Sequence, residues 1–290
     1  MDLDPAQLRA LSATVNEGTL EAAARVLHVT PSAVSQRLRA LEVAIGRVLL
    51  VRSRPVRPTP SGEVLLRLAR QVDLLTADAL TELGAGEGAV PTLPIAVNAD
   101  SLATWVLPAL APLAGDIALD LHREDEEHTA ALVRAGAVVA AVTTQPDAVP
   151  GCSVTRLGVM RYRPRAAPVF VRRWFPGGVT AAALARAPVV VFDRKDGLQH
   201  AYLRDRVPRD ATPPTHHVPS SADFLAAVRS GMGWGMLPDL QLDADDGLVE
   251  LDPAGAVDVV LHWQQWKLRS VPLDRVAAAV TAAARRHLRQ

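Results

Sequence analysis

The sequence predicts an α/β protein in which a small helical unit and one long helix precede a larger unit of alternating strands and helices. Residues 1–60 contain three short segments with helical apolar spacing and helix-capping residues. Residues 61–84 continue as one helical pattern. From residue 91 to residue 290, strand-like apolar runs, among them 169–171, alternate with helical segments, which indicates a mostly parallel sheet covered on both faces.

The composition excludes several classes of protein. The 290 residues have a formal net charge of zero and are 49% hydrophobic, which is typical of a globular chain rather than a disordered one. The single cysteine, Cys152, excludes an internal disulfide framework and agrees with a reducing cytoplasm. Residues 1–10 lack the pattern of a secretory signal, and the longest apolar run, 135–142, is too short to cross a bilayer. We therefore expect a cytoplasmic protein that does not contact membranes.

Residues that favour helix starts mark the second and third N-terminal helices. Residues 6–15 have helical spacing and end near Gly18. Thr19 is a favourable N-cap for the second helix, and Thr30 caps the third, with Pro31 at its first position. Only a short turn separates these two helices, which is the arrangement of a helix-turn-helix.

The third helix is expected to present an open polar face. Val34, Leu38, Leu41 and Ile45 recur on one buried stripe. Hydroxyl, amide and guanidinium groups on the opposite face suit the major groove of DNA. The alternative, an amphipathic helix with an ordinary polar exterior, explains neither the capped turn nor the basic segment that follows. The side chains expected on the polar face or its flank are Ser32, Ser35, Gln36 and Arg39.

Positive charge is concentrated between residues 30 and 60. This segment carries six arginines and one acid, whereas residues 1–29 carry two arginines and four acids. Its second half is rich in proline and is expected to form a wing that places arginines against phosphates or in the minor groove. A basic surface loop remains the alternative for any single arginine. The predicted DNA contacts are Thr30, Pro31, Ser32, Ser35, Gln36, Arg37, Arg39, Arg52, Arg54 and Arg57.

Residues 22–62 resemble the signature of LysR-type transcriptional regulators. The matching features are an alanine-rich second helix, the core T-x-S-A-V-S-x-x-L-x-x-L-E, the basic wing and T-x-x-G at its exit. The resemblance implies a winged helix-turn-helix domain over residues 1–60. It also implies that the partners are a double-stranded DNA operator and RNA polymerase.

The long helix after the wing carries a repeat that favours pairing with a second copy. Thr59 can cap a helix that begins at Pro60. Apolar residues then recur at alternating steps of three and four, which is the spacing of a coiled-coil seam. Packing against the chain's own N-terminal unit is the alternative. We predict a dimerising helix over 61–84 in a homodimer, possibly a tetramer, with a domain boundary in the glycine-rich stretch 84–92 and a seam of Leu65, Leu68, Val72, Leu75 and Ala79.

The larger unit is similar to the periplasmic-binding-protein-like effector domain of the same family. Stretches such as AVNADSLATWVLPALAP, FPGGVT and WGMLPDLQ match the ArgP/LysG group in particular. The resemblance implies two lobes, the first from residues 91–160 and 267–290 and the second from residues 161–266. It also implies an activator that senses lysine or arginine and controls an amino-acid exporter gene. The alternative is an architectural or replication-modulating DNA-binding protein that responds to no effector.

Polar residues at the ends of the expected strands are the candidates for binding such an effector. Ser101 starts a helix directly after Asn98, so its N–H and hydroxyl suit a carboxylate. Thr143 and Thr144 end another strand, and Ser221 belongs to a serine pair after Pro219, where the group often has asparagine. Several acids at strand ends or in loops together fit a cationic ligand, although each one alone is better explained as a cap or a solvated carboxylate. These acids are Asp100, Glu124, Asp125, Asp193 and Asp223.

Motifs for catalysis or metal binding are lacking. There is no G-x-S-x-G, no Walker loop and no His/Cys cluster with metal-ligand spacing. His216 and His217 are neighbours on an expected strand and would face opposite sides of the sheet. Trp234, Trp263 and Trp266 are expected to pack in the core or at a hinge. We therefore expect no enzyme activity and no metal or cofactor beyond the small-molecule effector.

Overall fold

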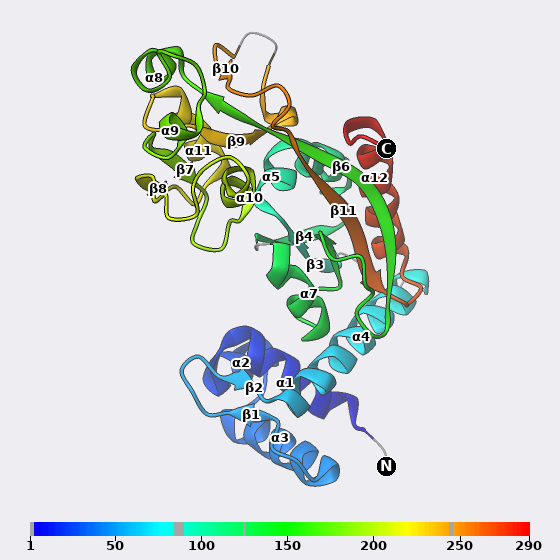
Figure 1. Ribbon diagram of the computed structural model, residues 1–290. Coiled ribbons are helices and arrows are strands. Elements are labelled where there is room, and N and C mark those ends of the chain that lie inside the picture. The colour runs from blue at the N-terminus through cyan, green and yellow to red at the C-terminus, as the bar shows by residue number, and fades with distance from the viewer. Residues whose placement is uncertain (1–2, 84–89, 124–125, 244–245) are drawn as a thin grey trace.

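The computed structural model describes residues 3–83, 90–123, 126–243 and 246–290. It separates a small N-terminal helical unit from a larger α/β unit, with the long helix α4 between them (Figure 1). The acids Glu124 and Asp125 lie outside the described residues, as does most of the predicted boundary segment 84–92.

The N-terminal unit forms around the helix caps that the sequence predicts. Thr19 and Thr30 accept hydrogen bonds through Oγ1 from the backbone N–H groups of Ala22 (3.1 Å) and Ala33 (3.2 Å). Gly46 ends the third helix at φ +71°, a left-handed conformation that glycine adopts without strain. A two-stranded antiparallel wing follows. The elements are α1 (Pro5–Glu17), α2 (Leu20–Val26), α3 (Pro31–Ile45), β1 (Leu50–Val51) and β2 (Arg57–Pro58).

Helix α4 (Pro60–Glu82) is packed against both units. Thr59 caps it by accepting a hydrogen bond from the N–H of Gly62 at 3.1 Å. Ala69 lies in the core of the N-terminal unit, and Leu74 lies in the core of the larger unit. Arg70 donates hydrogen bonds to Asn16 Oδ1 on α1 and to the carbonyl of Gly136, and burial lowers its pKa to about 10. The first four turns of α4 are thus packed against the N-terminal unit on one side and the larger unit on the other.

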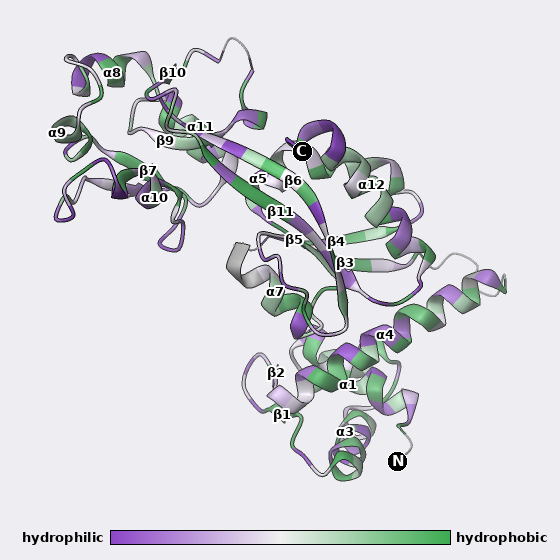
Figure 2. Ribbon diagram, turned by 45° about the vertical axis from the view of Figure 1, so that its right-hand side comes forward, coloured by the Kyte–Doolittle hydropathy of each residue, from purple (hydrophilic) through white to green (hydrophobic). Residues whose placement is uncertain are grey.

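The predicted seam of α4 divides into a packed half and an exposed half. Leu65, Leu68 and Val72 pack against the core of their own N-terminal unit. Leu75 is 45% exposed and Ala79 is also exposed, and the end of α4 extends past the rest of the molecule (Figure 2). The alternative of packing within the chain therefore holds for the first three positions. Pairing through the later ones stays a prediction.

The larger unit contains a mixed sheet of seven strands. Its order is β10-β6-β11-β5-β3-β4, with β9 also paired to β6. Strand β3 is parallel to β4 and β5, whereas β6, β9, β10 and β11 pair antiparallel. The expectation of a mostly parallel sheet is therefore wrong. The strands are β3 (Thr92–Val97), β4 (Ala118–Arg123), β5 (Ala140–Thr143), β6 (Cys152–Ala166), β9 (Gly235–Pro238), β10 (Val249–Glu250) and β11 (Val257–Trp266), with a separate parallel pair β7 (Val189–Val191) and β8 (Thr215–His217).

Two long strands join the two lobes of this unit. β6 has 15 residues, which at about 3.3 Å per residue span about 50 Å, and β11 runs beside it from one lobe to the other (Figures 1 and 2). The predicted boundary between residues 160 and 161 falls inside β6. Residues 262–265, expected in the second lobe, pair with β5 in the first. The lobes thus share β6 and β11 instead of meeting at a single junction.

Helices cover the sheet in both lobes. In the first lobe, the helical stretch 99–113 contains a π-helical turn at Leu102–Val106 between α5 and α6. Residues 169–171, expected as a strand, lie in α8, where Pro168 occupies the first helical turn. The helices are α5 (Ala99–Ser101), α6 (Leu107–Leu110), α7 (Glu126–Arg134), α8 (Pro168–Trp174), α9 (Ala181–Leu184), α10 (Leu198–Arg204), α11 (Ser221–Arg229) and α12 (Val271–His287), with short 3-10 turns at Ala111–Leu113 and Asp239–Gln241.

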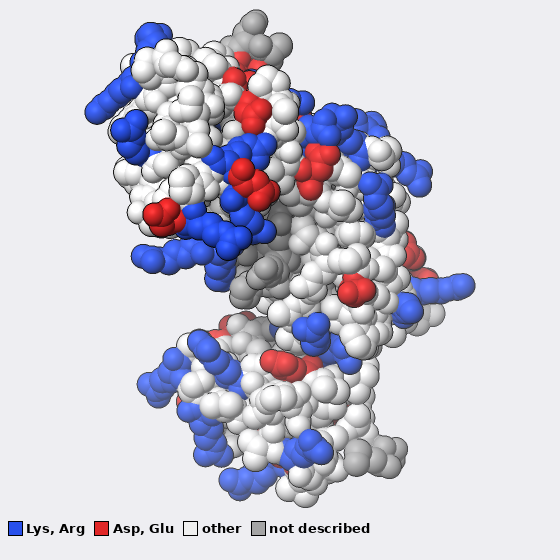
Figure 3. Space-filling model, viewed as in Figure 1, with Lys and Arg blue, Asp and Glu red and all other residues white. Residues whose placement is uncertain are grey.

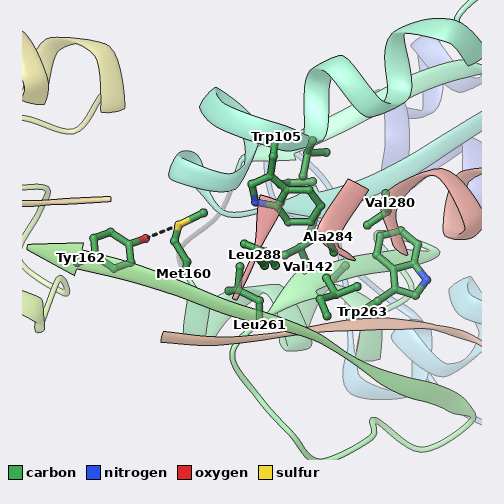
Figure 4. Close-up of a cluster of buried hydrophobic side chains, with 14 of the residues drawn as sticks. Trp105, Val142, Met160, Tyr162, Leu261, Trp263, Val280, Ala284 and Leu288 are labelled. Atoms are coloured by element: carbon green, nitrogen blue, oxygen red, sulfur yellow. Dashed lines mark hydrogen bonds between the residues drawn. The ribbon is translucent and has the colours of Figure 1, made fainter. Parts of the chain in front are cut away.

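The core of the larger unit follows the two shared strands. Figure 4 shows Trp105, Val142, Leu261 and Trp263 packed between the helices of the first lobe and the sheet, with Tyr162 at the end of the cluster. The Tyr162 hydroxyl oxygen lies 3.1 Å from Met160 Sδ (Figure 4). Trp234 and Trp266, like Trp263, are buried, as the sequence predicts for core tryptophans.

Candidate DNA-contacting surface and ligand cavity

The polar face of α3 is exposed as the sequence predicts. Ser32, Ser35, Gln36 and Arg39 are exposed, while Val34, Leu38 and Leu41 on the opposite face are buried. Arg37 is half-buried. Thr30 and Pro31 are exposed at the start of the helix, but the Thr30 hydroxyl caps the helix and hydrogen-bonds Ser32 Oγ at 2.9 Å. Its contribution at this surface is therefore to fix the helix start.

The wing adds exposed arginines beside this face. Arg52, Arg54 and Arg57 are all exposed. The one acid of this segment, Glu42, accepts a hydrogen bond from the N–H of Leu49 at 2.8 Å, so its charge is used to tie α3 to the wing. Figure 3 shows the Lys and Arg side chains gathered at the left and lower edge of the N-terminal unit. A positively charged surface of this kind matches a phosphate backbone.

The larger unit contains a cavity of about 360 Å³ between its lobes. The first lobe contributes Asn98 and Asp100, which follow β3, and the shared strand β6 contributes Tyr162. The second lobe supplies the loop after β7 and parts of α10, α11 and β9. This volume lies in the range of small-ligand sites. Its lining residues are Asn98, Ala99, Asp100, Tyr162, Phe192, Asp193, Lys195, Asp196, Gly197, Leu198, Gln199, Ala201, Phe224, Met236, Leu237, Pro238 and Gln241.

Asp100 connects the two lobes across this cavity. It accepts a hydrogen bond from the Tyr162 hydroxyl at 3.0 Å and another from the hydroxyl of Ser221, at the start of α11 in the second lobe. Burial raises the pKa of the Asp100 carboxyl, these two hydrogen bonds oppose the rise, and the nearby Asp196 adds to it. A buried carboxylate of this kind gains most from a cationic partner.

Two further carboxylates line the cavity from the loop after β7. Asp193 Oδ1 accepts hydrogen bonds from the N–H groups of Lys195 (2.7 Å) and Asp196 (3.0 Å). Asp196 accepts from the N–H groups of Phe192 and Leu198, each at 3.0 Å. Both acids therefore shape the loop, as the capping alternative expected for Asp193, and both also line the cavity. Together with Asp100 they outnumber the one cation in the lining, Lys195.

The structure brings only part of the predicted effector set to this cavity. Asn98, Asp100 and Asp193 line it, and Ser221 reaches it through Asp100. Ser101 is fully buried, Thr143 is 1% exposed and accepts a bond from the N–H of Gln145, and neither lines the cavity. Thr144 does not line it, and Asp223 is exposed on the first turn of α11. Sequence position at a strand end was therefore insufficient, because the second lobe supplies most of the wall.

Sequence reasoning missed several lining residues. Tyr162 lies in the middle of a strand, and Gln199 and Gln241 lie in helical turns, where polar side chains are ordinary surface residues. Of these missed residues, Asp196 was the one that the sequence could have indicated. It lies three residues after Asp193, as the second acid of the stretch DRKDG. Among the described residues, no His/Cys/Asp/Glu cluster is arranged to hold a metal ion, and no helix is long and apolar enough to cross a membrane.

Comparison with known proteins decides the family. The model of the "Bacterial regulatory helix-turn-helix protein, lysR family" matches residues 5–63, and that of the "LysR substrate binding domain" matches residues 86–287. The chain belongs to the LysR family of bacterial transcriptional regulators. The helix-turn-helix that holds α3 is that of a DNA-binding LysR-family regulator, and the relatives are regulators rather than enzymes. That the exposed face of α3 and the wing make the contacts stays a prediction.

Individual relatives of this LysR-family regulator cover nearly the whole chain. It is 48% identical to the "HTH-type transcriptional regulator LysG" of Mycobacterium tuberculosis over 97% of this chain and 94% of that protein. It is 43% identical to the "Lysine export transcriptional regulatory protein LysG" of Corynebacterium efficiens over 99% of this chain and 100% of that protein. The crystal structure of ArgP from Mycobacterium tuberculosis superposes with a TM-score of 0.89 at 46% identity, covering 99% of each chain. Full-length LysG from Corynebacterium glutamicum, with bound effector Arg, superposes with a TM-score of 0.80 at 37% identity, covering 99% of this chain and 100% of that one.

Proposed function

We propose that this LysR-family regulator senses a basic amino acid, lysine or arginine, in the cavity between its lobes. The observation that carries the proposal is the excess of carboxylates: Asp100, Asp193 and Asp196 line the cavity with a single lysine. A basic amino acid carries two cationic groups and one carboxylate, so three acids and one ammonium complement it. The bound Arg of the Corynebacterium glutamicum LysG supports the same class of ligand.

Apolar side chains of the cavity suit the methylene chain of such a ligand. Phe192, Leu198, Phe224 and Met236 lie in the same lining as the acids. Burial of methylene groups against them contributes about 0.8 kcal/mol each. The cavity therefore combines an apolar wall with charged groups, as a linear side chain ending in a cation requires.

Calorimetric titration of the full-length protein with lysine and with arginine tests this proposal. We expect saturable binding of at least one of them and a rise in the thermal midpoint with ligand concentration, because a ligand that binds only the folded state stabilises it. Leucine, which has a similar apolar body and no distal cation, is the matched control and should bind more weakly. No heat and no thermal shift with either basic amino acid would refute the effector assignment.

We further propose that the regulator is cytoplasmic and activates transcription of an amino-acid exporter gene. It would do so by acting on RNA polymerase at the promoter. The relative named for lysine export supports the target class. Ligand binding between lobes that share β6 and β11 would change how they are set relative to α4 and hence to paired DNA-binding units. An architectural DNA-binding role without an effector is the competing function. Genome-wide footprinting separates them, since clustered promoter sites favour regulation and broad occupancy of bendable tracts favours architecture.

Pairing of two chains through the later turns of α4 is part of the same proposal. Leu75 is 45% exposed, and Ala79, one turn further along the same face, is also exposed, which leaves both seam positions open to a partner helix. We expect Leu75→Glu to shift the full-length protein toward monomer in light scattering, because the charge would be buried in the seam. Val169→Glu, at an apolar position 56% exposed on the second lobe, is the control. A Leu75→Glu protein that keeps the wild-type mass would exclude this part of the seam.

A further inference from the structure

One buried amide in the cavity lacks any hydrogen-bond partner. Gln199, in the first turn of α10, is 1% exposed and lines the cavity. Neither its Nε2 nor its Oε1 has a hydrogen-bond partner among the described residues. Asn98, on the opposite lobe, lines the same cavity at 5% exposure, and its Oδ1 also has no partner. Buried polar atoms are hydrogen-bonded as a rule, so an amide with both ends unsatisfied is unusual.

An amide without hydrogen-bond partners destabilises the ligand-free protein, because its buried polar atoms have lost their hydrogen bonds to water. Each unsatisfied buried donor or acceptor destabilises a protein by roughly 1–3 kcal/mol, and an apolar side chain of similar shape would avoid this cost. The other glutamine of the lining shows the contrast, because Gln241 Nε2 donates to the carbonyl of Ser221 at 2.8 Å. Gln241 therefore has a structural partner, whereas neither end of the Gln199 amide has one among the described residues.

We infer that Gln199 recognises the α-amino and α-carboxylate groups of the ligand. The inference rests on the proposed amino-acid effector. It names a partner for the α-amino and α-carboxylate groups, because the acids of the cavity account only for cationic groups. A side-chain amide offers one acceptor and two donors on neighbouring atoms. An α-amino acid carries a donor ammonium and an acceptor carboxylate on one carbon, so a single amide can accept from the first and donate to the second. A guanidinium or a distal ammonium has donors only and would leave Nε2 unpaired.

The assignment replaces the role expected for Ser101. The Ser101 hydroxyl is fully buried and does not line the cavity, so it does not reach the carboxylate in this structure. Asn98 Oδ1 is an acceptor placed on the opposite lobe and suits an ammonium. The carboxylates of Asp100 and Asp196 then remain for the distal cation. In this assignment, neutral amides bind the α-amino and α-carboxylate groups of the ligand, and carboxylates bind its distal cation.

A cycle of ligands and variants tests the role of Gln199. The ligands are lysine, cadaverine, which lacks the α-carboxylate, and 6-aminohexanoate, which lacks the α-amine. In the wild-type protein we expect lysine to bind at least about tenfold more tightly than either truncated ligand, the range of a hydrogen bond to a charged group. In Gln199→Leu we expect lysine affinity to fall about tenfold and the preference for lysine over cadaverine to shrink to less than about threefold.

Gln241→Leu is the matched control, because it removes a partnered amide from the same wall. It should lower the thermal midpoint of the ligand-free protein and leave the ratio of lysine to cadaverine affinity unchanged. Gln199→Leu should leave the ligand-free midpoint unchanged or raise it, which a structural role would not produce. A Gln199→Leu protein that keeps the wild-type ratio, or that melts lower without ligand, would overturn the inference.

The same measurements separate this inference from the proposed function. A wild-type protein that binds norleucine but neither lysine nor arginine refutes the basic effector. In that case, the role of Gln199 is tested with norleucine and with pentylamine, which lacks the α-carboxylate. Gln199→Leu should then reduce the preference for norleucine over pentylamine. A wild-type protein that binds none of these amino acids overturns both proposals.

Discussion

The DNA-contacting surface and the ligand cavity place their functional side chains in opposite environments. Gln36 and the wing arginines are exposed, and their side chains contribute little to the core of the N-terminal unit. Asp100 and Gln199 are enclosed by two lobes, and one of them ties the lobes together. Function and stability should therefore be separable on the DNA-contacting surface and coupled in the cavity.

The largest expected effect follows from the core that supports the cavity. Trp234 is fully buried and packs edge-on against Tyr202, with ring centroids 5.4 Å apart. Trp234→Ala should destabilise the larger unit by about 3–5 kcal/mol, because it leaves a large cavity behind β9. Urea unfolding followed by circular dichroism measures the loss, and lysine binding should weaken with it.

Its control is a truncation at the surface of the same lobe. Val169 is 56% exposed, so Val169→Ala should change stability by less than about 0.5 kcal/mol. The coupling of stability and ligand binding would be contradicted if Trp234→Ala lowered stability as expected and still bound lysine with wild-type affinity.

The second prediction concerns the DNA-contacting surface, where stability should not change. Gln36→Ala should weaken binding to the operator by about 1–3 kcal/mol through loss of a base contact, with little effect on random DNA. Arg54→Ala should weaken both and reduce the salt dependence by about one counterion. Fluorescence anisotropy across a salt series measures both variants. Equal losses on operator and random DNA for Gln36→Ala would contradict base reading, and a lowered melting temperature in either variant would contradict the separation.

The same contrast explains what the sequence could predict. The caps at Thr19 and Thr30, the buried stripe of α3 and the exposed arginines all follow from neighbours within a few residues, so local rules place them correctly. The cavity is lined by Asp100, Tyr162, Gln199 and Gln241, which are far apart in the chain. They come together because the paired strands β6 and β11 run from one lobe to the other and hold the lobes side by side. The misassigned segment 169–171 has the same cause, since three apolar residues fit a strand or a helix and the neighbouring lobe decides.

The smallest expected effect concerns the titration of Asp100 in the ligand-free protein. Its pKa is raised chiefly by burial, so the folded state disfavours the ionised carboxyl relative to the unfolded state. The resulting cost is present above the folded-state pKa and is relieved as the pH falls through it. Asp100→Asn keeps the shape of the side chain and removes the charge. Without ligand, we expect the variant to melt a few degrees higher than wild type at neutral pH, with the difference shrinking in acid.

Lysine should reverse this order. A cation beside Asp100 stabilises the ionised carboxylate, so saturating lysine should raise the midpoint of the wild-type protein more than that of Asp100→Asn, whose affinity should fall about tenfold or more. Thermal melts of both proteins with and without lysine, from neutral pH downward, give the comparison. A variant that melts below wild type without ligand at neutral pH would show that the Asp100 hydrogen bonds to Tyr162 and Ser221 outweigh the cost of its buried charge. Asp100 would then stabilise the ligand-free fold, and the cavity would not carry the conflict between stability and binding that separates it from the DNA-contacting surface.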